Sequence, residues 1–165
     1  MSTSIPKILT PRLCLRALNV SDVEDIFDTY SDKNAMKFRG NPPLATWEEA
    51  QQMIQKAIAD YAYGRSIRWG IELLNQNKLI GTFLWTTQKG QHQIGYSIHK
   101  NWWRKGVATE VLTAMSEHLF TERGIDQLTA NVHPDNLGSI KLLEKCGFKL
   151  GTRTKDLLTF YKLST

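Results

Sequence analysis

The sequence predicts an α/β (α+β) fold: one domain built on a mixed, mainly antiparallel sheet of about seven strands, with helices on both faces. Two patterns support this prediction. Three alternating segments joined by short turns form an antiparallel meander, and a strand–helix–strand unit then adds a parallel crossover. The chain also has 165 residues without repeats, linkers or low-complexity tracts. Because this length suits a single domain, we expect residues 1–165 to fold as one unit.

One strand and two helices are expected before the meander. Residues 12–16 alternate polar and apolar side chains and predict a strand. Ser21 and Glu24 have the spacing of a capping box and predict the start of the first helix. Thr46 and Glu49 have the same spacing and predict the start of a second helix. The expected buried face of this second helix consists of Met53, Ile54, Ala57, Ile58 and Tyr61.

The remaining elements are predicted by the same rules. The expected meander strands are 67–74, 79–87 and 91–99. After them we expect a helix at about 106–122, a strand at 127–132, a helix at about 136–145 and two short strands at 148–154 and 157–163. Glycines commonly follow the last turn of a helix, and the three longer helices are expected to end at Gly64, Gly124 and Gly147.

Composition excludes several classes of protein. Cys14 and Cys146 are the only cysteines and lie far apart in the sequence, so we expect a reducing compartment and no disulfide framework. No apolar run approaches the ~20 residues that span a membrane. The polar N-terminus lacks the apolar core of a secretion signal. We therefore expect a cytoplasmic protein with no membrane partner.

The net charge of +5 is unevenly distributed along the chain. Residues 20–60 contain eight acids and four bases, a net charge of −4, whereas residues 141–165 contain six bases and two acids, a net charge of +4. A basic surface suits a polyanion, either a nucleic acid or a phosphorylated cofactor. Charge alone does not separate these partners from an ordinary solvated surface.

The start of the helix at residue 106 is the most informative local feature. A helix begins with about four backbone N–H groups that lack partners, and Ser, Thr, Asp or Asn usually caps them. Here Arg104, Lys105 and Gly106 precede the helix instead. Free N–H groups, a positive dipole end, two cations and a residue without Cβ together favour a phosphate site. The alternative is an ordinary surface helix with a solvated first turn.

Three segments, taken together in their order and spacing, resemble the GNAT superfamily of acyl-CoA-dependent N-acetyltransferases over nearly the whole chain. They are Thr10-Pro-Arg-Leu-Cys-Leu-Arg16; Ile94-Gly-Tyr-Ser-Ile98 running into Trp103-Arg-Lys-Gly-Val-Ala-Thr-Glu110; and Val132-His-Pro-Asp-Asn-Leu-Gly-Ser139 followed by Leu143-Glu-Lys-Cys-Gly-Phe148. The chain is most similar to the branch that contains the ribosomal-protein N-terminal acetyltransferases. The resemblance implies a GNAT-like fold with acetyl-CoA (coenzyme A) as co-substrate and no metal.

The resemblance also implies where the pyrophosphate of coenzyme A binds. The family's loop reads Gln/Arg-x-x-Gly-x-Gly/Ala, and Gly106 and Ala108 match its last two fixed positions. Trp103 stands at the first position, which departs from the superfamily pattern but is similar to the named branch. The residues expected to wrap the pyrophosphate are Arg104, Lys105, Gly106, Val107, Ala108 and Thr109.

A second part of the resemblance implies contacts near the thioester. Asn136 and Ser139 match the branch's Asn-x-x-Ser. Asn136 is expected to contact the pantetheine arm, and Ser139 is expected to lie near the sulfur and to protonate the departing thiolate. Judged as residues alone, Asn136 suits a helix N-cap and Ser139 a polar position in the first turn. Leu143 occupies the position where many superfamily members place a tyrosine acid.

The third meander strand is expected to lie beside the pantetheine arm. Ile98 and His99 end this strand and are expected to bind the cofactor. Family members typically bulge the strand so that its free amides pair with pantetheine, and Gly95 permits such a bend. The alternative role for Gly95 is to accommodate a neighbouring side chain.

The general base is not evident in the sequence. Related proteins often carry Glu just before the Ile-Gly-Tyr segment, but Gln93 stands there and cannot take a proton. The remaining candidates are His92, His99, His133 and Asp135. Deprotonating a lysine amine at pH 7 costs roughly 4–5 kcal/mol, whereas an α-amine costs only roughly 1 kcal/mol. The missing carboxylate therefore favours an acceptor that needs little deprotonation, such as an α-amine.

Three functional hypotheses follow. The first is an acetyl-CoA-dependent N-acetyltransferase, monomeric or homodimeric, that acts on a protein N-terminus or a small amine by direct attack in a ternary complex. Its acidic first two helices would frame the acceptor entrance and steer a cationic amine. The second is a catalytically silent acyl-CoA-binding or sensor protein, because Gln93 has no evident replacement. The third is a nucleic-acid-binding module; the chain has no recognition motif for it, so we expect no nucleic acid partner.

Overall fold

The computed structural model describes residues 4–165. The chain begins with the strands β1 (Ile8–Leu9) and β2 (Leu13–Ala17), the short helix η1 (Val20–Asp22), and the helices α1 (Val23–Tyr30) and α2 (Trp47–Ala62). The meander strands are β3 (Ser66–Leu73), β4 (Lys78–Gln88) and β5 (Gln91–Ile98). The rest of the chain forms η2 (Lys100–Trp102), α3 (Val107–Thr121), β6 (Gln127–Val132), α4 (Leu137–Lys145), β7 (Lys149–Arg153) and β8 (Leu158–Leu163).

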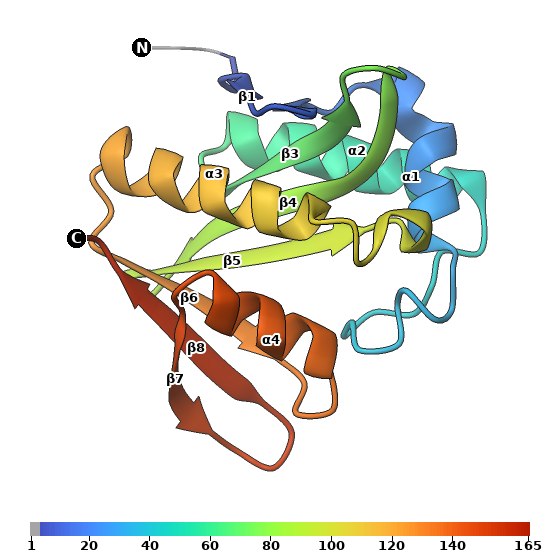
Figure 1. Cartoon of the computed structure of the whole chain (residues 1–165). Helices are drawn as coiled ribbons and strands as arrows, with labels where there is room; N and C mark the ends of the chain where they lie inside the picture. The colour runs from blue at the N-terminus through green and yellow to red at the C-terminus, as the bar shows by residue number, and fades with distance from the viewer. Residues whose placement is uncertain (1–3) are drawn as a thin grey trace.

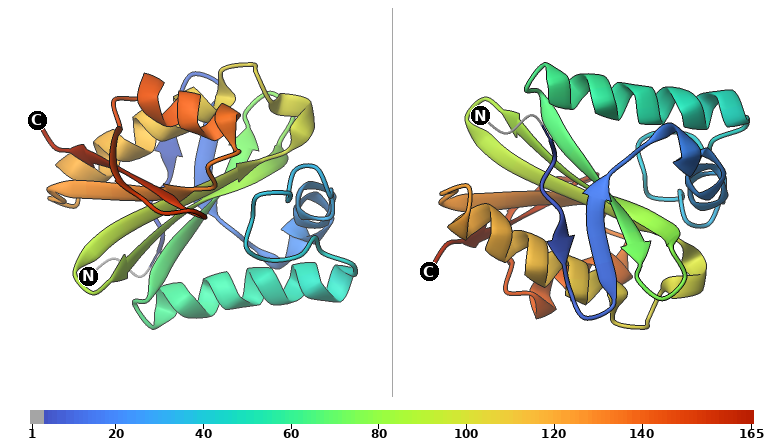
Figure 2. Two further views of the ribbon diagram at one scale, coloured as in Figure 1. Left: turned by 90° about the horizontal axis from the view of Figure 1, so that it is seen from below. Right: turned by 90° about the horizontal axis from the view of Figure 1, so that it is seen from above.

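One sheet of eight strands runs through the molecule in the order β1-β2-β3-β4-β5-β6-β8-β7. Its neighbouring strands are antiparallel except β5 and β6, which are parallel. Figures 1 and 2 show α1 and α2 on one face of the sheet and α3 and α4 on the other. The predicted mixed fold is confirmed, with one more strand than expected, since the two-residue β1 is too short to show an alternating pattern.

Two apolar clusters hold the helices to the sheet. The larger cluster joins α3 and α4 to one face, and its fully buried members include Trp69, Phe83 and Met115. The smaller cluster joins α1 and α2 to the other face through residues such as Ile26 and Ile54. Burial of these side chains is the main favourable contribution to folding, so both helix layers depend on the same sheet for their stability.

The parallel pair β5–β6 is short, and this creates the opening on which the site is built. The two strands pair only at His92–Leu128, Gln93–Thr129 and Ile94–Ala130, and then they diverge (Figure 1). Helix α3 follows the end of β5, and α4 follows the end of β6. The N-termini of both helices therefore lie at the edge where the strands part, which is where α/β sheets commonly bind ligands.

Some local predictions are wrong. The first helix is preceded by the turn η1, whose capping box joins Asn19 and Asp22 rather than Ser21 and Glu24. The helical turn starts earlier than the periodic residues, because the Asn19 side chain accepts the N–H of Ser21 and Asp22 accepts the N–H of Asn19. The second capping residue, Thr46, is confirmed, since its hydroxyl accepts the N–H of Glu49.

The expected inward face of α2 is also partly wrong. Ile54 and Ala57 are buried, but Ile58 is 47% exposed, and Ala50 and Asp60 are buried in addition. The buried stripe contains Ala50, Ile54 and Ala57, and the Asp60 carboxylate at the end of the helix is paired with Lys56 and Arg65.

No bulge interrupts β5 on its β4 side. The β4–β5 register runs without a shift from Gly81–Ile98 to Gln88–Gln91, whereas the sheet is irregular at Ile71/Glu72 between β3 and β4. The expected bulge near Gly95 is therefore absent. β6 diverges from β5 after Ile94, so the backbone groups on the outer edge of β5 beyond Ile94 have no strand partner. The expected bulge would have freed amides of this strand in the same way.

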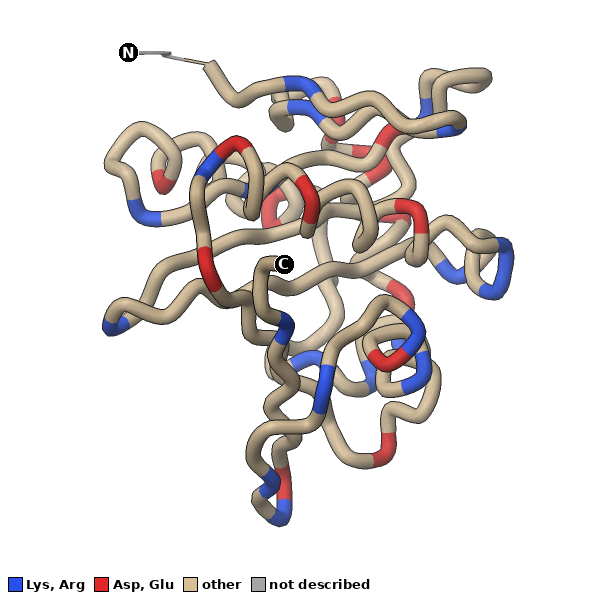
Figure 3. The backbone as a smooth tube through the Cα atoms, turned by 60° about the vertical axis from the view of Figure 1, so that its left-hand side comes forward, with Lys and Arg blue, Asp and Glu red and all other residues tan. Residues whose placement is uncertain are grey.

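Three general features of the described chain concern its charge distribution, membrane-spanning helices and metal ligands. Acidic and basic positions are interspersed over the molecule, and basic positions occur along the C-terminal hairpin (Figure 3). No helix among residues 4–165 is both long enough and apolar enough to cross a membrane. Within the same residues, no three His, Cys, Asp or Glu side chains gather in a way that could hold a metal ion.

Candidate active site

The start of α3 lacks a side-chain cap, as predicted. Gly106 is the N-cap residue, with a left-handed φ of 79°, and no side chain bonds to the first turn from this position. Arg104 also has a positive φ of 59°. The N–H groups of Val107, Ala108 and Thr109 donate to no other residue in the described part of the chain. A ring of free N–H groups at a positive helix end, with cations beside it, fits a pyrophosphate.

The turn between β1 and β2, near the N-terminal end of the described chain, fixes this loop. The Arg12 guanidinium donates from Nη1 to the carbonyl of Lys105 at 3.0 Å and from Nε to Oε1 of Glu110 at 2.8 Å. The other oxygen of Glu110 accepts the hydroxyl of Thr10 at 2.5 Å and the N–H of Arg12 at 3.0 Å. Thr10, Arg12 and Glu110 carried the family resemblance without an assigned role, and the structure shows that they clamp the loop.

These bonds also change the acidity of Glu110. Partial burial by itself would raise the pKa of Glu110, but the hydrogen bonds from Thr10 and Arg12 and the charge of Arg12 outweigh it. The pKa of Glu110 is therefore held below its ordinary value. The carboxylate stays charged at neutral pH and keeps its bonds to Thr10 and Arg12 in the turn before β2.

Trp103 has a structural role at the point where it departs from the superfamily pattern. Its indole Nε1 donates to the carbonyl of Ile98 at 2.8 Å, which ties the loop to the end of β5. The N–H of His99 donates to Ile80 on β4. Because successive N–H groups of a strand point to opposite edges, the N–H of Ile98 faces the opening and that of His99 does not. Of the two predicted cofactor residues, Ile98 therefore has the better placed amide.

Two hydroxyls meet across the opening between β5 and β6. The phenol of Tyr96 on β5 lies 2.8 Å from Oγ of Ser139 in the first turn of α4. The side chain of Asn136 caps α4, since its Oδ1 accepts the N–H of Ser139 at 3.2 Å. The N-cap interpretation of Asn136 is confirmed, and it orients Ser139. The sequence offered Tyr96 only as one of several aromatics that could line an acceptor pocket, and its pairing with Ser139 was not predicted because the two residues are 43 positions apart.

The environment keeps the Tyr96 phenol protonated. Burial raises the pKa of Tyr96 to about 12, although the hydrogen bond with Ser139 acts in the opposite direction. A neutral phenol can donate its proton to Ser139, and this leaves the serine hydroxyl free to donate towards the opening.

In two of the histidine candidates, His99 and His133, the ring nitrogen that could accept a proton already has a partner. Nδ1 of His99 accepts the N–H of Asn101, and its Nε2 lies 3.0 Å from Oδ2 of Asp28. Nδ1 of His133 accepts the N–H of Asp135 at 3.0 Å, so the neutral ring carries its proton on Nε2. Neither ring offers a free lone pair, so neither is arranged as a general base.

The other candidates form no hydrogen bond with the hydroxyl pair in the described part of the chain. His92 stacks on Trp85 with ring centroids 5.8 Å apart, and the side chain of Asp135 is 81% exposed. Gln93 lines a surface hollow of about 230 Å³ at the β4–β5 turn, together with Gln88, Lys89 and Gln91. The site therefore offers two hydroxyls and a helix start with free N–H groups, and no carboxylate is arranged there as a base.

Comparisons with known proteins agree with this geometry. A family model described as "Acetyltransferase (GNAT) domain" matches residues 12–149. The uncharacterized N-acetyltransferase YoaA of Bacillus subtilis (strain 168) is 36% identical over 147 residues, which cover 87% of this chain and 83% of that protein. The [ribosomal protein uS5]-alanine N-acetyltransferase of Escherichia coli (strain K12) is 25% identical over 169 residues, covering 94% of this chain and 86% of that protein.

A solved structure also has the same fold. The ribosomal L7/L12 alpha-N-protein acetyltransferase RimL, in complex with coenzyme A, superposes with a TM-score of 0.83 at 18% identity, covering 96% of this chain and 98% of that chain. The family model spans most of this chain, and YoaA exceeds 30% identity over most of both proteins. The chain therefore belongs to the acetyltransferase (GNAT) family and is an N-acetyltransferase.

Proposed function

We propose that this N-acetyltransferase takes acetyl-CoA as its co-substrate and transfers the acetyl group to a primary amine by direct attack in a ternary complex. The acceptor is a protein N-terminal α-amine or a small-molecule amine. One observation carries the proposal: the uncapped start of α3 and the Tyr96–Ser139 pair lie at the same edge, where β5 and β6 part.

The residues at this edge fit the three parts of coenzyme A. The free N–H groups of residues 107–109 and the cations Arg104 and Lys105 suit the pyrophosphate. The unpaired edge of β5 up to Ile98 suits the amides of pantetheine, which would pair with it like an added strand. Asn136 has a side-chain NH₂ that its capping bond leaves available, and this group suits a pantetheine carbonyl.

The hydroxyl pair suits the departure of the thiol. Acetyl-CoA supplies an acetyl group on sulfur, and a thiol of pKa about 8.5 leaves readily with modest assistance. Ser139 would pass its hydroxyl proton to the departing sulfur and recover the proton that the attacking amine loses, while Tyr96 donates a hydrogen bond to the Ser139 oxygen throughout. The phenol orients the serine and does not need to ionise, in agreement with its raised pKa.

The lack of an arranged base favours an acceptor with a low pKa. His99 and His133 have no free lone pair, and Gln93 cannot accept a proton. An α-amine with a pKa of about 7.7–8.0 costs only roughly 1 kcal/mol to deprotonate at pH 7. RimL and the uS5-alanine enzyme are described as acting on protein α-amines, which supports the same choice.

Release of free thiol from acetyl-CoA tests the proposal. The acceptors are α-amine peptides, lysine peptides, polyamines and aminoglycosides. We expect turnover with an α-amine, and a slower rate with unchanged acetyl-CoA affinity for Ser139→Ala. Robust lysine acetylation without α-amine activity would contradict the acceptor class. Tight acetyl-CoA binding without turnover of any amine would instead indicate the silent acyl-CoA-binding protein.

A further inference from the structure

Two half-buried arginines on the α1–α2 side of the sheet have no carboxylate partner. Arg39 lies in the loop between α1 and α2, and Arg68 lies on β3. Neither forms an ion pair with any of residues 4–165. Arg16 provides the contrast, because its side chain is only 16% exposed and pairs with both Asp22 and Glu72.

Arg39 and Arg68 meet around one buried pair of hydroxyls. The phenol of Tyr30 lies 2.5 Å from Oγ1 of Thr82. The guanidinium carbon of Arg39 lies 4.4 Å from the Tyr30 ring centroid, and Nη1 of Arg68 donates to Thr82 at 2.9 Å. Burial lowers the pKa of Arg39, and the charge of Arg68 acts in the same direction. Two like charges therefore share one partly dehydrated region.

Most of the N–H groups on these side chains have no acceptor in the described protein. A guanidinium has five N–H donors. Arg68 uses one of them on Thr82, and the only side-chain hydrogen bond of Arg39 is a weak one of 3.4 Å to the sulfur of Met36. Burying a cation is costly unless it is paired and hydrogen-bonded. An anion bound between the two groups would satisfy both requirements.

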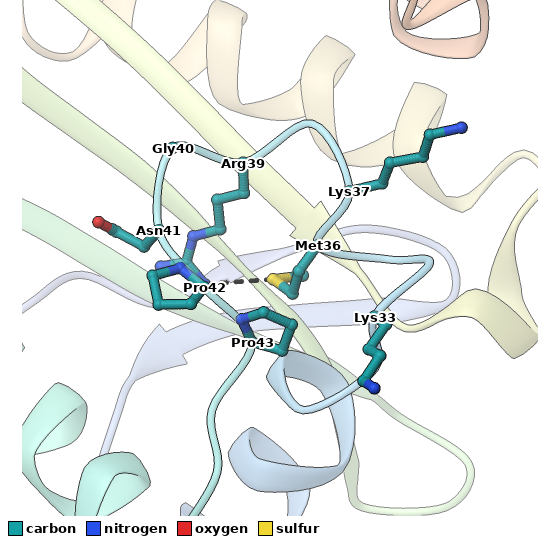
Figure 4. A pocket seen from close by; sticks show the side chains of 8 residues that line it. All are labelled: Lys33, Met36, Lys37, Arg39, Gly40, Asn41, Pro42 and Pro43. Atoms are coloured by element: carbon teal, nitrogen blue, oxygen red, sulfur yellow. Dashed lines mark hydrogen bonds between the residues drawn. The ribbon is translucent and has the colours of Figure 1, made fainter.

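A cavity of about 410 Å³ opens beside Arg39, within the α1–α2 loop. Three cations, Lys33, Lys37 and Arg39, contribute to its described lining, and no acidic side chain does. Figure 4 shows the Arg39 side chain pointing across the loop towards Met36, while Lys33 and Lys37 point outwards. The cavity is therefore accessible to a small anion at the guanidinium of Arg39.

This region faces the opening between β5 and β6. Phe38 of the loop stacks on His133 at the end of β6, with ring centroids 5.2 Å apart. Thr82 lies opposite Ser97 of β5 in the β4–β5 register. Coenzyme A would reach the opening from the side of α3 and α4. The acceptor then enters from the α1–α2 side, past Arg39 and Arg68.

Several acidic side chains of residues 20–60 are already engaged within the protein. The partners are Arg16 for Asp22, the N–H of Leu79 for Asp25, His99 for Asp28, Lys100 for Asp32, and Lys56 and Arg65 for Asp60. Glu24 and Glu48 form no ion pair or side-chain hydrogen bond with any of residues 4–165. The charged side chains that line the cavity in the α1–α2 loop are basic and form no ion pair with any of residues 4–165.

We propose that Arg39 and Arg68 bind an anionic group, a carboxylate or a phosphate, on the amine acceptor. This inference rests on the proposed function and narrows it, since the acceptor then carries a negative charge near its reactive amine. The planar fork of arginine matches the oxygens of both groups, which a lysine does not.

Matched acceptors and matched variants test the inference. The acceptors are aspartyl and asparaginyl peptides, and O-phosphoseryl and seryl peptides, each pair differing mainly in charge. The variants are Arg39→Gln and Arg68→Gln. Arg65→Gln is the control, because Arg65 lies just before β3, is 60% exposed and pairs with Asp60. Acetyl-CoA thiol release is measured for every combination, and circular dichroism checks the fold.

We expect the wild-type enzyme to prefer one anionic acceptor over its neutral partner by about tenfold or more in kcat/KM. Each of the two variants should remove about tenfold of this preference, mainly through KM, with the neutral acceptor and acetyl-CoA unaffected. Arg65→Gln should retain the preference. The aspartyl and phosphoseryl arms show which anion the site takes. The inference would be overturned if the wild type had equal kcat/KM for charged and neutral acceptors. It would also be overturned if the two variants lost equal activity on both kinds of acceptor.

Calorimetry separates this inference from the proposed function. If no peptide is turned over, the proposed function fails, but binding of the same peptides still tests the arginines. Tighter binding of an anionic peptide that Arg39→Gln weakens about tenfold would support the site, and binding that ignores peptide charge would overturn it. Arg39 lies in a loop, so its variant keeps the test valid even where Arg68→Gln fails to fold.

Discussion

The phenol of Tyr96 and the hydroxyl of Ser139 lie 2.8 Å apart, one on β5 and the other in the first turn of α4. Their hydrogen bond crosses the opening in which the thioester is proposed to lie. It depends on the divergence of β5 and β6 and on the cap that Asn136 places on α4. Two weak acids in series suit a leaving group that needs only modest help.

Replacing Tyr96 by Phe should lower kcat about tenfold, because one hydrogen bond of roughly 1.4 kcal/mol no longer orients Ser139. The KM for acetyl-CoA should change little, since the phenol donates to the serine. The Tyr96→Phe/Ser139→Ala double variant should be no slower than Ser139→Ala alone. Steady-state kinetics of the three variants measure this, and additive losses would show that the two hydroxyls act independently.

The raised pKa of Tyr96 makes a separate prediction about pH. The protonated phenol is the active form, and its pKa of about 12 keeps it protonated throughout pH 7–10. The wild-type kcat should therefore show no loss with an apparent pKa near 10. The pH profiles of the wild type and Tyr96→Phe should run parallel up to pH 10. A wild-type decline near pH 10 that is absent from the variant would mean that the phenol titrates normally.

Features built from neighbouring residues in the sequence were predictable, whereas features that join distant residues were not. The uncapped start of α3 was predictable because the cap and the first turn are adjacent in the chain, and Asn136 was predictable as a cap for the same reason. The partnership of Tyr96 with Ser139 depends on how α4 packs against β5, which no local pattern encodes. The role of Arg39 depends on a missing partner, and only the folded chain shows which carboxylates are engaged elsewhere.

Glu110→Gln should destabilise the protein by about 1.5–3 kcal/mol at pH 7, the range for hydrogen bonds to a charged group. The depressed pKa of Glu110 means that its contribution is present above the ordinary value of 4.5 and is lost as pH falls through the folded-state pKa. As the pH falls below about 4.5, the free energy of unfolding should therefore decrease less for Glu110→Gln than for the wild type. Urea denaturation at pH 7 and at acid pH measures both effects.

A matched control for Glu110 is Glu122→Gln at the other end of α3. Glu122 is exposed and its side chain has no hydrogen-bond or ion-pair partner among residues 4–165, so its replacement should leave the acid profile unchanged. Equal effects of the two substitutions would show that the clamp to Thr10 and Arg12 contributes nothing measurable.

Gly106→Ala should weaken both the fold and acetyl-CoA binding. A φ of 79° costs an L-residue roughly 1–2 kcal/mol, and the new Cβ would lie 3.4 Å from Nη2 of Arg12. Gly40→Ala is the control, because Gly40 has no positive φ and no atom within 4 Å of an added Cβ. Thermal unfolding and titration with acetyl-CoA measure the two effects, and equal stability of the two variants would contradict the assigned strain.

Asn136 combines a cap with a proposed cofactor contact, and two substitutions separate them. Asn136→Ala removes the acceptor for the N–H of Ser139 and should cost about 1 kcal/mol of stability. Asn136→Asp keeps a capping oxygen but lacks the NH₂ donor, so its stability should stay near that of the wild type. Both should raise the KM for acetyl-CoA if the amide binds pantetheine. A stable Asn136→Asp variant with an unchanged KM would restrict Asn136 to orienting Ser139.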